Sequence, residues 1–133
     1  MKISSDEEMQ KFGADFFQTL KLPAAIQLIG DVGVGKTTFT RGLAKSMGIS
    51  EPVTSPSFTI SKRYAGKKGN LIHYDFYRLD DPGLMAEDLN DALSEEDSVV
   101  VIEWGSSIEN LLPAQCKKIH IALNDDGTRE VTL

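Results

Sequence analysis

Cysteine is nearly absent from this sequence, because Cys116 is the only one among its 133 residues. A single thiol cannot form an internal disulfide, and such sparse cysteine usage is typical of a reducing cytosol. Long apolar runs are also missing, and no stretch approaches the length needed to cross a membrane. Residues 1–20 mix charged and apolar residues, unlike a signal peptide. We therefore expect a cytoplasmic protein with no disulfide and no membrane contact.

An excess of positive charge is missing as well. Fourteen lysines and arginines against 20 acidic residues give a net charge of −6, which argues against a broad nucleic-acid-binding face. Any contact with RNA would need a local patch or the surface of a partner. The remaining composition, 41% hydrophobic and 26% charged, is that of a soluble globular protein. The length supports one domain but not two, so we expect residues 1–133 to form a single domain.

A glycine-rich segment carries the strongest functional signal. The apolar residues 24–29 predict a buried strand, and a helix is predicted to follow the segment. Gly30, Gly35, Lys36 and Thr37 match G-x-x-x-x-G-K-[ST], the phosphate-binding loop. In such a loop backbone N–H groups surround the phosphates, the lysine reaches the β- and γ-phosphates, and the hydroxyl binds Mg²⁺. The residues expected to contact a nucleotide here are Gly30, Asp31, Val32, Gly33, Val34, Gly35, Lys36, Thr37 and Thr38.

The rest of the chain alternates between helical and strand patterns. Ser4-Ser5-Asp6 is a helix start, and apolar residues at three- and four-residue spacing follow it up to Leu20. The pattern predicts an α/β fold, a single three-layer P-loop NTPase domain with a mixed, mainly parallel sheet and β-hairpins at its edges. The other predicted elements are a hairpin of strands 58–64 and 71–75, an acidic helix opening at Asp81-Pro82-Gly83, a strand at 98–102, a short helix at 108–112, and a hairpin of strands 118–123 and 128–133.

Two acidic residues stand at the ends of predicted strands. Asp75 follows the apolar residues 71–74, and Glu103 follows 99–102. At the carboxyl ends of such strands an acid can hold Mg²⁺, directly or through water, and can orient an attacking water. We therefore predict Lys36, Asp75 and Glu103 as the catalytic residues, and the spacing leaves open which acid lies closer to the metal. The alternative is that each is a solvated carboxylate without a role.

Three further features are weaker. The hydroxyl-rich loop Thr54-Ser55-Pro56-Ser57 stands where P-loop proteins carry a segment that senses the γ-phosphate, but it can equally be an ordinary polar loop. Trp104 is interpreted as a core residue, although an adenine platform or a partner contact is also compatible with its position. His73, inside a predicted strand, is interpreted as structural rather than catalytic.

Four stretches occur in the order and spacing of one protein family. They are the phosphate loop with the Phe-Thr-Arg-Gly after it, residues 53–59, residues 73–79, and Ile102-Glu103-Trp104. Together they resemble the bacterial TsaE (YjeE) ATPases, which serve biosynthesis of the threonylcarbamoyladenosine modification of transfer RNA. The phosphate loop alone is generic, whereas His-x-Asp-x-Tyr-Arg-Leu followed by Glu-Trp is specific to the family.

The resemblance implies binding of ATP and ADP with Mg²⁺, and slow ATP hydrolysis that depends on the TsaB and TsaD proteins. TsaD, with TsaB, transfers the threonylcarbamoyl group in this family, and the ATPase sustains turnover. Transfer RNA is then expected to be contacted only indirectly. By motif, Thr37 and Glu103 bind the metal, Asp75 is the switch-type acid needed for hydrolysis, Ser57 senses the γ-phosphate, and Arg129 flanks the nucleotide.

The sequence departs from the family pattern at three positions. Met9 falls where a threonine commonly lies near the adenine, so a base contact there would be apolar or through the backbone. Ser57 replaces a threonine and keeps its hydroxyl. Gly105 replaces the proline that usually follows Glu-Trp, which loosens that loop.

Other classes of P-loop protein fit less well. A GTPase would carry a late Asn-Lys-x-Asp segment, and here Asn124 is followed by Asp125 in a predicted turn. A small-molecule kinase needs a lid and an acceptor-binding insert, for which this length leaves no room. A nucleotide-gated adaptor that does not hydrolyse ATP would use the same residues and remains open.

Overall fold

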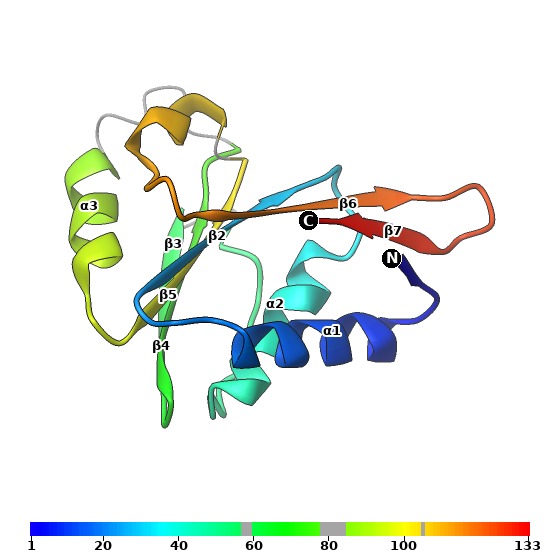
Figure 1. The fold of residues 1–133 in the computed structure, drawn as a ribbon, viewed down its shortest axis with the longest axis horizontal. Coiled ribbons are helices and arrows are strands. Elements are labelled where there is room, and N and C mark those ends of the chain that lie inside the picture. Colours follow the sequence, from blue (N-terminus) through cyan, green and yellow to red (C-terminus); the bar gives the residue numbers. More distant parts are fainter. Residues whose placement is uncertain (57–59, 78–84, 105) are drawn as a thin grey trace.

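The structure, a computed structural model, describes residues 1–56, 60–77, 85–104 and 106–133. In the described residues seven strands form one sheet in the order β1-β7-β6-β2-β5-β4-β3, drawn in Figure 1. The strands are β1 (Lys2–Ile3), β2 (Ala24–Ile29), β3 (Ser61–Gly66), β4 (Gly69–Asp75), β5 (Ser98–Glu103), β6 (Lys117–Leu123) and β7 (Arg129–Thr132). The helices are α1 (Asp6–Gln18), α2 (Lys36–Ser46), α3 (Ala86–Ser94) and the 3₁₀ helix η2 (Ser106–Leu111).

The centre of the sheet consists of parallel strands. β2 pairs in parallel with β5 and β6, and β5 pairs in parallel with β4. All six residues of β5 are buried, as expected for a strand covered on both faces. The register aligns Asp75 at the end of β4 with Glu103 at the end of β5. Because β2 ends at the same edge of the sheet, the glycine-rich loop and both acids come together there.

Helices cover both faces of the sheet, which makes three layers (Figure 1). The helices α1 and α2 pack on one face, where residues such as Phe16, Phe39 and Leu43 join the larger apolar core. α3 and η2 cover the other face through Leu89 and Ile108. None of the helices in the described ranges is long and apolar enough to cross a membrane.

Close contact between α1 and α2 depends on a glycine. A side chain at Gly42 in α2 would collide with the backbone of Gln10 in α1. The three rings of Phe12, Phe16 and Phe39 fill the adjoining space, with centroids 5.6 to 5.9 Å apart. This packing fixes the direction of α2, and therefore of its N-terminus at the phosphate loop.

The edges of the sheet are antiparallel. β3 and β4 form a hairpin with Lys67 and Lys68 in its turn, and β6 and β7 form the second hairpin. β1 pairs with β7 and brings the first residues of the chain beside residues 129–130. The predicted α/β fold with a mixed, mainly parallel sheet and edge hairpins is confirmed.

Several predicted boundaries change. The strand expected at 58–64 is found at Ser61–Gly66, and residues 57–59 lie outside the described ranges. In the described residues the acidic helix begins at Ala86. Its predicted start at Asp81-Pro82-Gly83 lies outside the described ranges. The short β1 was not predicted, because two residues are too few to show a period.

Candidate nucleotide-binding site

The glycine-rich loop joins the end of β2 to the start of α2. Gly35 precedes the helix with a φ of 112°, a left-handed conformation that glycine adopts at little steric cost. The chain turns sharply there, and Gly35, Lys36, Thr37 and Thr38 line a cavity of about 610 Å³. The first N–H groups of a helix have no partner within it and favour a bound anion. The loop therefore has the geometry of a phosphate site.

Lys36 is the most buried cation of this cavity, with 5% of its surface exposed. Its Nζ donates to the carbonyl of Gly30 over 2.7 Å and lies 3.6 Å from Oε1 of Glu103. The same Nζ lies 4.1 Å from the centroid of the Trp104 ring, within the range of a cation–π interaction. A buried ammonium group is stable only with such partners, so Lys36 is held inside the cavity.

Asp75 and Glu103 lie side by side in the same cavity. Glu103 is 4% exposed, and one of its oxygens, Oε2, lies 2.5 Å from Nε2 of His73. Oδ1 of Asp75 accepts a 2.9 Å hydrogen bond from the backbone N–H of Tyr77, which orients the Asp75 carboxylate. The two strand-end acids are therefore both fixed by neighbours.

The residues at this site suit Mg²⁺. Carboxylate and hydroxyl oxygens, which this metal prefers, line the cavity from Thr37, Asp75 and Glu103. Elsewhere in the described ranges, as here, no three His, Cys, Asp or Glu residues lie close enough to hold a metal by themselves. Mg²⁺ usually takes one or two protein ligands together with phosphate oxygens and water. The residues present fit a metal that arrives with a nucleotide.

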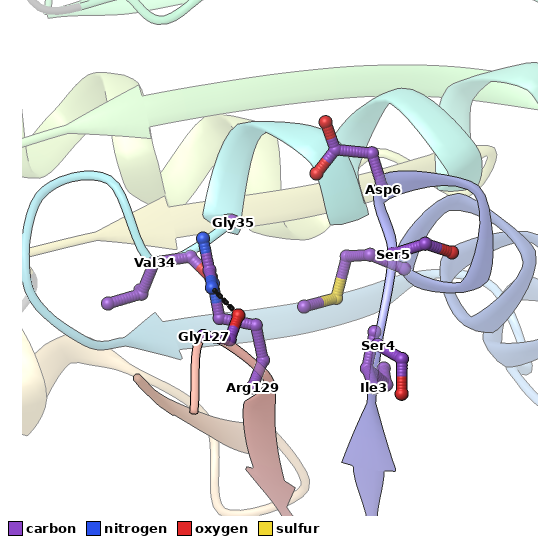
Figure 2. A pocket seen from close by; sticks show the side chains of 9 residues that line it. Ile3, Ser4, Ser5, Asp6, Val34, Gly35, Gly127 and Arg129 are labelled. Carbon is purple, nitrogen blue, oxygen red and sulfur yellow. Dashed lines mark hydrogen bonds between the residues drawn. The ribbon is translucent and has the colours of Figure 1, made fainter. Parts of the chain in front are cut away.

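A smaller cavity of about 130 Å³ adjoins the first and shares Asp6, Gly35 and Arg129 with it. Figure 2 shows its two walls, the segment Ile3 to Asp6 on one side and Val34, Gly35, Gly127 and Arg129 on the other. Met9 also lines it, and Met9 is 2% exposed. The cavity is therefore built from residues that lie more than 100 positions apart in the sequence.

Arg129 connects β7 to the phosphate loop. Its Nε donates to the carbonyl of Val34 over 2.8 Å, and its Nη2 lies 3.4 Å from the carbonyl of Gly33. Nη1 donates to Gly127 over 2.7 Å, the bond that is dashed in Figure 2. The guanidinium group thus binds two backbone carbonyls of the glycine-rich loop.

The structure brings most of the predicted site residues together. Val32, Gly33, Gly35, Lys36, Thr37, Thr38, Asp75, Glu103 and Arg129 line the larger cavity, and Met9 and Val34 line the smaller one. Gly30 contributes its carbonyl to Lys36, whereas Asp31 is exposed and lines neither of these two cavities. Ser57 lies outside the described residues, although Ser55 of the same loop lines the larger cavity.

One prediction was wrong, and lining residues of both cavities were missed, among them Tyr77 and Asp6 of the larger one. Trp104 is not a core residue; it is half-buried, lines the larger cavity and contacts the ring of Tyr77. Its φ of 56° turns the chain at the end of β5, so the ring points into the cavity instead of the core. Tyr77 and Asp6 also line the cavity. Tyr77 stands two residues after Asp75, which was the available signal; nothing in the sequence around Asp6 indicated the cavity.

Known proteins resemble this chain over most of its length. The family profile described as "Threonylcarbamoyl adenosine biosynthesis protein TsaE" matches residues 3–131. A TsaE protein of Bacillus subtilis is 42% identical over 108 residues, which are 80% of this chain and 66% of that protein. A TsaE protein of Streptomyces coelicolor is 37% identical over 94% of this chain and 88% of its own length.

A solved structure agrees with these sequence matches. The crystal structure of the Bacillus subtilis protein YdiB superposes with a TM-score of 0.83 at 31% sequence identity, over 98% of this chain and 80% of that one. Both the fold and the sequence thus lead to one conclusion: the chain belongs to the TsaE family of threonylcarbamoyladenosine biosynthesis proteins.

Proposed function

We propose that this protein binds ATP with Mg²⁺ and hydrolyses it slowly, and that turnover depends on the TsaB and TsaD proteins of the pathway. The observation that carries the proposal is the position of Lys36. Its buried ammonium group lies at the start of α2, 3.6 Å from Glu103, in a cavity that Thr37 and Asp75 also line. A lysine, a hydroxyl and two carboxylates around a phosphate loop are the parts that phosphoryl transfer requires.

Phosphate binding would exchange one set of contacts for another. Lys36 now uses the Gly30 carbonyl and Glu103 as partners. A phosphate oxygen carries more negative charge than a carbonyl and can take the place of Gly30 as hydrogen-bond acceptor. The N–H groups at the start of α2 would bind the same phosphates.

Thr37 and Glu103 would hold the Mg²⁺ that accompanies the nucleotide, and this ion neutralises the phosphate charge that develops during transfer. Asp75 would orient the attacking water. The hydrogen bond from Tyr77 N–H restricts how the Asp75 carboxylate can turn, which favours one position for that water. Ser57, in the loop that follows Ser55, is the proposed contact of the γ-phosphate.

The nucleoside would occupy the smaller cavity. Met9 lines this cavity with 2% of its surface exposed, so it would give the adenine only a small apolar contact, and Arg129 would flank the nucleotide between the two cavities. The dependence on TsaB and TsaD, an indirect relation to transfer RNA and a place in the cytoplasm belong to the same proposal, and membership of the TsaE family supports them.

The test is ATP hydrolysis by the purified protein, measured alone and then with cognate TsaB and TsaD. We expect slow release of phosphate alone, faster release with the partners, and little with GTP. Lys36→Ala, purified in the same way, is the control for contaminating ATPases. Binding of ATP without turnover, even with both partners, would make the protein a nucleotide-gated adaptor. An absence of ATP binding would refute the proposal altogether.

A further inference from the structure

A buried histidine outside the phosphate loop contacts one of the site acids. His73 lies in the middle of β4, and none of its surface is exposed. Its backbone is paired with Val101 of β5, two residues before Glu103. The imidazole Nε2 lies 2.5 Å from Oε2 of Glu103. The histidine is thus placed behind the carboxylate, on the side of the protein interior.

The hydrogen-bond pattern assigns the position of the imidazole hydrogen. A carboxylate oxygen accepts and does not donate, so Nε2 of His73 carries the hydrogen. Within the described residues Nδ1 of His73 is buried and has no hydrogen-bond partner. Leaving a buried polar atom unpaired costs about 1–3 kcal/mol. Packing alone therefore does not explain a histidine here, since an apolar residue would avoid that cost.

The contact determines what Glu103 presents to the cavity. With Oε2 bonded to His73, the other oxygen, Oε1, lies 3.6 Å from Nζ of Lys36. A carboxylate held at one oxygen cannot rotate freely about its last side-chain bond, so Oε1 stays on the side of the phosphate loop. Without that bond the charged group has several orientations, and binding a metal must select one of them.

We propose that His73 is a positioning residue, whose Nε2–H holds the Glu103 carboxylate so that Oε1 is ready to bind Mg²⁺ directly or through water. The inference rests on the proposed function, because it requires Glu103 to serve the metal. Groups that orient a metal ligand in this way typically change metal affinity by about 10- to 100-fold when they are removed. His73 itself touches neither the nucleotide nor the metal in this account.

Two amide variants separate positioning from packing. In His73→Gln the side-chain nitrogen reaches the place of Nε2 and can still donate to Glu103. In His73→Asn the amide is equally polar but ends nearer the backbone, at the place of Nδ1, and cannot reach. Gln27→Leu is the matched control, since Gln27 is a buried polar residue of β2 that also has an unpaired atom, Oε1.

The measurement is binding of fluorescent ADP as a function of Mg²⁺ concentration, repeated with EDTA, together with thermal unfolding of each variant. We expect His73→Asn to raise the half-saturating Mg²⁺ concentration by about tenfold or more, with metal-free ADP affinity within about threefold of the parent. His73→Gln should keep a Mg²⁺ dependence close to that of the parent protein, because it retains the donor to Glu103, and Gln27→Leu should match the parent. Should His73→Asn fail to fold, His73→Leu replaces it as the variant without a donor.

Three outcomes overturn the inference. A folded His73→Asn, or His73→Leu, with the parent Mg²⁺ dependence shows that Glu103 needs no support from His73. If His73→Gln and His73→Asn raise the half-saturating Mg²⁺ concentration equally, the role of His73 is packing. If His73→Asn and His73→Leu are both unfolded, the test rests on His73→Gln. A folded His73→Gln that needs more Mg²⁺ than the parent overturns the inference, and a folded His73→Gln that needs the same Mg²⁺ concentration supports it. A parent protein without Mg²⁺-dependent binding refutes the proposed function instead. The parent Mg²⁺ dependence in Glu103→Ala, which lacks both side-chain oxygens, would do the same, because Glu103 would then serve no metal.

Discussion

The contact between Arg129 and the phosphate loop predicts a measurable loss of nucleotide affinity in Arg129→Ala. The Nε bond to the Val34 carbonyl, at 2.8 Å, has good geometry, whereas the 3.4 Å contact with Gly33 is near the limit and adds little. The peptide that follows Val34 is planar and trans, so holding its carbonyl toward Arg129 points the Gly35 N–H to the opposite side. A hydrogen bond from a charged donor stabilises by about 1.5–3 kcal/mol, and we use the lower value because Arg129 is half-exposed. We therefore expect about tenfold weaker binding.

The assay should separate an effect on the loop from a direct contact with the nucleoside. Titrations with ATP and with inorganic tripolyphosphate can both follow Trp104 emission, since the single tryptophan lines the cavity. If Arg129 acts through the loop, both ligands lose about the same factor. Arg129→Lys should not restore binding, because one ammonium group does not reproduce the planar set of donors. Lys2→Ala, which removes the 3.2 Å ion pair with Asp126 in the turn between β6 and β7, is the control for stability of that edge.

Parent affinity for tripolyphosphate in Arg129→Ala would refute the reasoning about the loop. If Arg129→Lys binds both ligands as tightly as the parent, the positive charge at this position is sufficient and the hydrogen-bond geometry of arginine is not required.

The other predictions concern the cavity and the opposite face. Lys36→Ala should abolish nucleotide binding in a calorimetric titration, and retained affinity would remove the lysine from the site. Asp75→Ala should bind ATP nearly as the parent does but lose phosphate release in the presence of TsaB and TsaD; normal turnover would show that another group orients the water. Burial, followed by the 2.8 Å hydrogen bond to Asp88, raises the pKa of Tyr74 above its ordinary value of 10.0. The folded protein then keeps a proton that the unfolded chain releases, so the free energy of unfolding should fall as the pH rises above that value. Denaturant titrations of Tyr74→Phe should show a smaller fall over the same pH range, and an equal fall would show that Tyr74 is not its cause.

The positions of the glycine-rich loop and of the strand-end acids can be predicted from the sequence, because each depends on neighbouring residues. A strand, a glycine turn and a helix start within 24–38 specify the loop, and an apolar run before an acid specifies a strand end. Which strands are neighbours is decided by packing over the whole chain. For that reason the contact between His73 and Glu103, which depends on the register of β4 against β5, has no signal in the sequence.

Trp104 shows a second limit. A tryptophan after a buried strand is normally placed in the core by its apolar area. Here the left-handed backbone at residue 104 reverses the direction of the side chain, and a nearby ammonium group takes the place of apolar neighbours. Backbone conformation at a single non-glycine residue leaves no trace in composition or period. The role of Arg129 was likewise suggested only by resemblance to a family, since its contacts join β7 to a loop that lies 95 residues away.

The two-sided cavity of Figure 2 has a consequence for how the protein is made. During synthesis a ribosome delivers the phosphate loop early, yet the wall that holds Gly127 and Arg129 emerges roughly ninety residues later. Until then β6 has no β7 beside it, and the segment at Lys2–Ile3 has no strand to pair with. A nascent chain that has just exposed its glycine-rich loop therefore lacks the second wall of the cavity in which we propose that the nucleoside binds. Nucleotide in the cell would act on folding only as a late ligand, which stabilises chains after both ends of the described fold have met.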